Sequence, residues 1–108
     1  MMSLYMTEIL NDSMTDYCRS HFMTFASVLR IAIYDLMKKE KSLYSIIRED
    51  LKDNPHMERR EKKTVQKCIA LPEELIGELK EYCEKNKSRM SYTINIACVL
   101  YLQEQCWN

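Results

Sequence analysis

The feature that most constrains the fold of this chain is one stretch of alternating residues at positions 64–71. Its side chains fall on two faces, with Val65, Lys67, Ile69 and Leu71 on one and Thr64, Gln66, Cys68 and Ala70 on the other. Alternation over this length predicts a half-buried strand. A single strand leaves the N–H and C=O groups of its edges without partners, so this strand requires a second one.

An amphipathic helix is predicted directly after this strand. Pro72 suits the first position of a helix because its missing N–H has no partner there, and the two following glutamates suit the positive end of the helix dipole. One apolar stripe then recurs at helical spacing, formed by Leu75, Leu79, Tyr82 and Cys83. We expect this helix to end near Lys85.

A second helix is predicted after the polar break at 86–89, with Ser88 or Ser91 as its N-terminal cap. Apolar residues lie on nearly all of its sides, namely Ile94, Ile96, Ala97, Cys98, Val99, Leu100, Tyr101 and Leu102. Such a helix must be buried on more than one side, so the segment requires a partner. The chain has one Gly and two Pro, which argues against a β-sandwich or barrel and for a mainly helical fold.

The segment 64–104 resembles the Arc/MetJ-type ribbon-helix-helix family of DNA-binding proteins. The resemblance rests on the run Ile69–Leu75, on Leu79, and on the turn residues 88–91 followed by Ile94 and Ala97. The Leu-Pro-Glu-Glu-Leu element at 71–75 is the most specific part. The family usually has glycine in the turn between its helices. Lys87 takes that place here, so we expect this turn to differ.

A second copy of the pattern is found when the sequence is shifted by 65 positions, without a gap from residue 1 to about residue 39. The apolar stripes agree, with Leu10, Met14, Tyr17 and Cys18 in the first helix and Leu29, Ala32, Ile33, Leu36 and Met37 in the second. The alternative is a chance alignment of two amphipathic helix pairs. The repeat predicts a strand at 2–6, helices at about 7–20 and 24–39, and Thr24 at the start of the second helix.

These patterns divide the chain into a degenerate first unit at 1–41, a helical and basic linker at 42–63, and a second unit at 64–108. In the linker, Ser42 is expected to cap a helix with the stripe Leu43, Ile46, Ile47 and Leu51, which residues 53–56 end. The net charge is zero, but residues 38–67 carry ten positive and six negative charges. The predicted fold is a mainly α tandem ribbon-helix-helix pseudodimer, with one short two-stranded antiparallel ribbon and four or five helices.

In the family that the chain resembles, the paired strands lie in the major groove of DNA, and their outward side chains contact base edges. The resemblance implies these base-reading positions: Gln66, Cys68, Ala70, Met1, Ser3 and Tyr5. Phosphate contacts are expected at the starts of the second helices and from basic residues beside the ribbon: Thr24, Phe25, Ala26, Lys87, Arg89, Met90, Ser91, Arg59, Arg60, Lys62, Lys63 and Lys67. The base-reading set has no arginine, so few polar contacts to bases are expected.

The predicted function is sequence-specific binding of double-stranded DNA. The setting that the resemblance implies is a small transcriptional repressor, or an accessory protein of a plasmid, phage or conjugation system, whose single-chain units can self-associate. The alternative is a protein-interaction module, antitoxin-like or inhibitory, that keeps the fold without reading DNA. Zero net charge and the sparse base-reading face favour this alternative.

No enzymatic activity, cofactor or metal site is expected. Cys18 and His21 have metal-like spacing but no second pair, and neither a catalytic triad pattern nor a Gly-rich phosphate loop occurs. Five cysteines without a CxxC pair indicate reduced thiols, mostly buried. The first ten residues lack the pattern of a signal peptide, and the apolar run 96–102 is too short to span a bilayer. We therefore expect a cytoplasmic protein without membrane contact.

Overall fold

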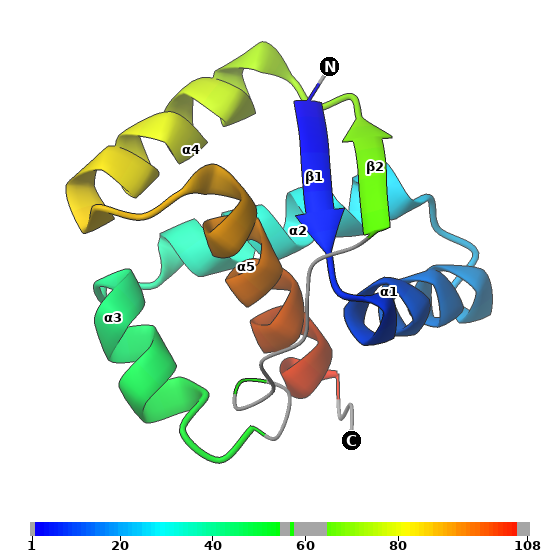
Figure 1. Ribbon diagram of the computed structural model, residues 1–108, viewed down its shortest axis with the longest axis horizontal. Coiled ribbons are helices and arrows are strands. Elements are labelled where there is room, and N and C mark those ends of the chain that lie inside the picture. The colour runs from blue at the N-terminus through cyan, green and yellow to red at the C-terminus, as the bar shows by residue number, and fades with distance from the viewer. Residues whose placement is uncertain (1, 55–56, 58–64, 106–108) are drawn as a thin grey trace.

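The computed structural model of the protein describes residues 2–54, 57 and 65–105. In these residues the chain is mainly helical and contains one two-stranded sheet (Figure 1). The elements follow in the order β1 (Met2–Met6), α1 (Glu8–Ser20), α2 (Phe25–Lys38), α3 (Leu43–Ser45), the π-helical turn η1 (Ile46–Asp50), β2 (Val65–Ile69), α4 (Glu73–Asn86) and α5 (Met90–Glu104). The expected mainly α fold with one short antiparallel ribbon is therefore confirmed.

The two strands form an antiparallel ribbon within one chain. The opposed pairs are Met2 with Ile69, Ser3 with Cys68, Leu4 with Lys67, Tyr5 with Gln66 and Met6 with Val65. The strand predicted at 2–6 is confirmed, and the strand predicted at 64–71 is confirmed with narrower bounds. The partner that the second strand requires is thus supplied by the start of the same chain.

The core lies beneath the ribbon, where α2 packs against α5 more extensively than any other pair of helices (Figure 1). Leu4 and Met6 from β1 and Ile69 from β2 point into this core and are buried. Every residue of α5 from Thr93 to Leu102 is buried as well. The expectation that the second helix is buried on more than one side is confirmed.

The two helices of the first pair begin 65 residues before the two helices of the second pair. Helices α1 and α4 begin at Glu8 and Glu73, and α2 and α5 begin at Phe25 and Met90. The buried positions of the first pair also correspond, with Leu10, Met14 and Cys18 in α1 and Leu75, Leu79 and Cys83 in α4. The two helix pairs thus agree in their starts and in the buried positions of their first helices.

The two helix–helix turns have the same backbone conformation. Phe22 and Lys87 each have a φ of 53°, in the left-handed region, and they are 65 residues apart. In both turns the next N–H donates to a carbonyl in the last helical turn at 2.9 Å, from Met23 to Cys18 and from Ser88 to Cys83. Lys87 therefore adopts the conformation for which glycine is usually selected, although we expected this turn to differ.

The N-terminal caps agree with the sequence at two of three positions. Thr24 accepts a hydrogen bond from the Ser27 amide at 3.1 Å, and Ser42 accepts one from the Ser45 amide at 3.1 Å. The cap predicted at Ser88 or Ser91 is wrong, because Arg89 occupies the cap position of α5 without a side-chain bond. The Ser88 hydroxyl is instead held by Thr93 at 2.8 Å.

The helical segment of the linker, α3 and η1, is short and is bonded to the C-terminal ends of α4 and α5. Its predicted stripe is buried at Leu43, Ile46 and Leu51, and it ends at Asp50, before the predicted break at 53–56. Near its start, the Leu43 amide donates to Asn86 Oδ1 at 2.8 Å, and near its end Gln103 Nε2 donates to the Asp50 carbonyl at 2.7 Å. These bonds attach α3 and η1 to α4 and α5.

Replacing Lys87 or Phe22 with glycine should stabilise the protein. A non-glycine residue in the left-handed region costs about 1–2 kcal/mol, and glycine adds about 0.5–1 kcal/mol of chain entropy to the unfolded state. We expect each variant to raise the free energy of unfolding by about 0.5–1 kcal/mol. Urea denaturation followed by circular dichroism measures this change.

The matched control is Lys80→Gly in the interior of α4, where the residue is exposed and helical. This variant should lose about 1 kcal/mol, because glycine lacks helix propensity and gains nothing from a left-handed turn. A loss of stability in Lys87→Gly of the same size as in Lys80→Gly would contradict the left-handed turn.

Candidate nucleic-acid interface

The outer face of the ribbon brings together most of the base-reading residues that the sequence predicts. Four predicted base-reading residues are exposed on it, Ser3, Tyr5, Gln66 and Cys68, and the fifth, Ala70, is exposed directly after β2. Ser3 lies opposite Cys68, and Tyr5 lies opposite Gln66. Gln66 Nε2 is 3.5 Å from Ser3 Oγ, a long contact across the ribbon. Met1 lies outside the described residues, so its predicted role stays a prediction.

The inner face fixes the ribbon onto the helices. Below β1, Asn95 Nδ2 donates to the Tyr5 carbonyl at 2.9 Å and to the Ser91 carbonyl at 2.6 Å. Asn95 is buried in a helix that is otherwise almost wholly apolar, so its amide has no water to replace these partners. The backbone beneath the exposed Tyr5 side chain is therefore held directly by α5.

Lys67 occupies the inner face of β2, not the outer one. Its Nζ lies 4.2 Å from the centre of the Phe25 ring at the start of α2, and the residue is half-buried. A cation above an aromatic face is attracted by the ring quadrupole. The contact joins β2 to α2, and the predicted phosphate contact of Lys67 stays a prediction.

The starts of α2 and α5 flank the ribbon on opposite sides (Figure 1). Phe25 places the start of α2 beside β2, and Asn95 ties α5 to β1. The predicted phosphate-contact residues at these starts are partly or fully exposed, namely Thr24, Phe25, Ala26, Lys87, Arg89, Met90 and Ser91. Free N–H groups at helix starts favour anions, and Lys87 and Arg89 add positive charge beside α5.

The basic run before β2 is the part of the predicted site that falls outside the described residues. It comprises Arg59, Arg60, Lys62 and Lys63. All four residues lie within six positions of Val65, the first residue of β2. The predicted phosphate contacts of these four residues stay predictions.

Two residues near this interface were not singled out from the sequence. Asn95 could have been found as the one amide side chain within the apolar run 94–102, where a buried polar group needs a partner. Phe22 is 97 % exposed in the left-handed turn before α2, where its counterpart after the 65-residue shift is Lys87. The 65-position shift aligns Phe22 with Lys87, the residue in the other helix–helix turn, and this alignment could have drawn attention to Phe22.

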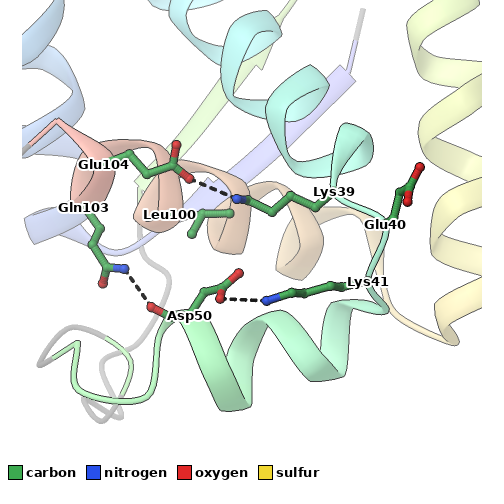
Figure 2. A pocket seen from close by; sticks show the side chains of 7 residues that line it. All are labelled: Lys39, Glu40, Lys41, Asp50, Leu100, Gln103 and Glu104. Atoms are coloured by element: carbon green, nitrogen blue, oxygen red, sulfur yellow. Dashed lines mark hydrogen bonds and ion pairs between the residues drawn. The ribbon is translucent and has the colours of Figure 1, made fainter.

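A separate pocket of about 500 Å³ lies at the other end of the molecule, where α2 and α5 end (Figure 2). Lys39 Nζ is 3.4 Å from Glu104, and Lys41 Nζ is 3.0 Å from Asp50. The hydrogen bond that Lys41 Nζ donates to the Asp50 carboxylate raises the pKa of the Lys41 ammonium. The two lysines that line the pocket are thus paired with carboxylates, and Glu40 adds a further negative charge to the lining.

The cysteine and histidine that have metal-like spacing do not point to one site. Cys18 is buried, and burial raises the pKa of its thiol. His21 is exposed and stacks on Tyr17 with ring centres 4.0 Å apart. Among the residues that the structure describes, no three His, Cys, Asp or Glu side chains gather as a metal site would require.

Comparisons with protein-family models, with curated proteins and with solved structures gave no match for this chain. Within the described part of the chain, no helix combines the length and apolar character needed to cross a bilayer.

Cysteine alkylation tests the orientation of the ribbon. Cys68 is exposed on the outer face, whereas Cys18, Cys83 and Cys98 are buried, and burial strongly raises the pKa of the Cys98 thiol. The thiolate is the reactive form, and burial protects a thiol from the reagent. We therefore expect iodoacetamide to label the exposed Cys68 roughly tenfold or more faster than the three buried cysteines. Peptide mass spectrometry measures the rates, in a Cys106→Ser background that leaves four thiols.

Equal labelling of all four thiols in urea is the control for intrinsic reactivity. Slow labelling of Cys68 in the folded protein would mean that the outer face of the ribbon is covered.

Proposed function

We propose that this chain is a tandem pair of ribbon-helix-helix units that binds double-stranded DNA sequence-specifically. The observation that carries the proposal is the exposed outer face of the antiparallel ribbon, flanked by the starts of α2 and α5. A two-stranded ribbon fits the width of the major groove, and flanking helix starts can bind the phosphates on either side. The 65-residue correspondence of helix starts and turns supports a tandem pair.

The role that suits such a unit is that of a small repressor or of an accessory protein in a plasmid, phage or conjugation system. This assignment follows from the family resemblance of residues 64–104, since related folds serve several functions. In this role the ribbon would supply base contacts. The basic run Arg59, Arg60, Lys62 and Lys63 and the basic residues of the α4–α5 turn would supply the salt-dependent attraction to phosphate.

The second candidate is a protein-interaction module with the same fold. Two observations favour it. The net charge is zero, and the outer face carries only one side chain able to make a bidentate base contact, Gln66. A module of this kind would use the exposed surface for a protein partner and would show no salt-dependent DNA binding.

Salt-dependent binding to duplex DNA separates the two candidates. Fluorescence anisotropy should show that the protein binds a random duplex at about 50 mM salt and that the affinity falls steeply by about 200 mM. The affinity falls because binding releases counterions from the phosphates, and added salt opposes this release. Lys62→Glu combined with Lys63→Glu should weaken binding about tenfold or more, because each lost cation lowers the number of phosphates neutralised.

Lys38→Glu combined with Lys52→Glu is the matched control. Both residues are exposed, and both lie away from the ribbon, at the end of α2 and just after η1. The control changes the net charge equally, so it should weaken binding much less. Absence of DNA binding at low salt would exclude the proposed function and favour the protein-interaction module.

Protection of Cys68 locates the bound DNA. If duplex DNA lies across the outer face of the ribbon, it should slow the alkylation of Cys68 about tenfold or more at saturating DNA, on the order expected for a site that is bound more than nine-tenths of the time. Binding without this protection would place the DNA on another surface of the protein.

A further inference from the structure

The outer face of the ribbon has a centre defined by the repeat. Ser3 and Cys68 lie opposite each other and are also 65 residues apart, so each is the counterpart of the other. The pair therefore marks the position where the two halves of the ribbon meet. Both side chains are small and exposed, so the central pair presents similar groups on the two strands.

The two ends of the outer face are chemically different. On one side of the centre, Tyr5 lies opposite Gln66 and presents a phenol that is 44 % exposed. The counterpart of Tyr5 on the other side is Ala70, which is exposed and offers only a methyl group. A carboxamide can bond N6 and N7 of adenine at once, whereas a methyl group can only make apolar contact, for example with thymine.

The Tyr5–Gln66 end is also the better anchored one. Asn95 of α5 holds the Tyr5 carbonyl at 2.9 Å, while the counterpart of Asn95 in α2 is the exposed Arg30. Asn95 therefore holds the backbone of the strand that lies opposite Gln66, which fixes the position of this end of the ribbon. Gln66 makes only the long 3.5 Å contact to Ser3, so its carboxamide can turn toward a base at little cost.

We infer that the ribbon recognises a directional DNA sequence, with an adenine bound by Gln66 at the Tyr5 end and an apolar contact at Ala70. This inference rests on the proposed DNA-binding function. A symmetric dimer of identical strands selects a palindrome, because its two-fold axis is repeated in the site. Here the scaffold repeats but the outward side chains do not, so one chain bound in one orientation specifies a non-palindromic site.

The test begins with selection of bound duplexes from a randomised library by the full-length chain. We expect a non-palindromic preferred site with adenine at one end. Two palindromes are then built by duplicating each half of this site. The palindrome that lacks the adenine should bind about tenfold or more weakly than the selected site, since a lost bidentate contact has about that effect.

The variant Gln66→Ala tests whether Gln66 is the residue that contacts the adenine. This variant should reduce the preference for adenine about tenfold or more at that end and leave the other positions of the site unchanged. Ala70→Ser is the matched control on the opposite side, and it should alter preference only at its own end. Thermal unfolding of both variants verifies that the fold is retained, as expected for exposed positions.

The outcomes separate this inference from the function on which it rests. A palindromic preferred site, or a Gln66→Ala variant that changes both ends equally, overturns directional recognition while DNA binding stands. Binding without sequence preference overturns directional recognition and also the sequence specificity of the proposed function. Absence of binding at low salt overturns the proposed function itself.

Discussion

The hydrogen-bonding requirement of two short strands organises the whole molecule. Neither five-residue strand can satisfy its backbone groups alone, and the antiparallel pairing of β1 with β2 joins the start of the chain to residues 65–69. Once these segments are paired, the helix pair that follows each strand must lie on the same side of the ribbon. Helices α2 and α5 then meet beneath it and bury the core that both pairs share.

The two central helices are not equally buried in this shared core, and the described part of the linker is bonded to α5. On α5, Ile96 and Val99 are almost completely buried, whereas their counterparts on α2, Ile31 and Tyr34, are 37 % and 41 % exposed. Two linker residues are bonded to Gln103 of α5: the Asp50 carbonyl accepts from its amide, and the Asn54 amide donates to its side-chain oxygen. The presence of the linker explains why α5 is apolar on nearly all sides while α2 keeps a mixed surface.

The same division separates packing from recognition on the ribbon. Inward side chains must fit the core, so both halves use apolar residues or, at Lys67, a cation placed over the Phe25 ring. Outward side chains are exposed and need not fit the core, which allows Tyr5 and Ala70 to differ at positions 65 residues apart. The ribbon therefore combines corresponding inward positions with two chemically different ends on its outer face.

The sequence by itself determined the second strand, its outward face and the main helices, because period-two and helical apolar patterns depend on local geometry. The first strand was predicted from the 65-position shift of the sequence. Local patterns could not predict the cap of α5, since the Ser88 hydroxyl bonds to Thr93 instead of a helix N–H. They also missed the position of Asn95 beneath Tyr5, which depends on residues 90 positions apart. Strand register, the placement of Lys67 over Phe25 and the covering of α5 were decided only by tertiary structure, because each requires segments distant in sequence to meet.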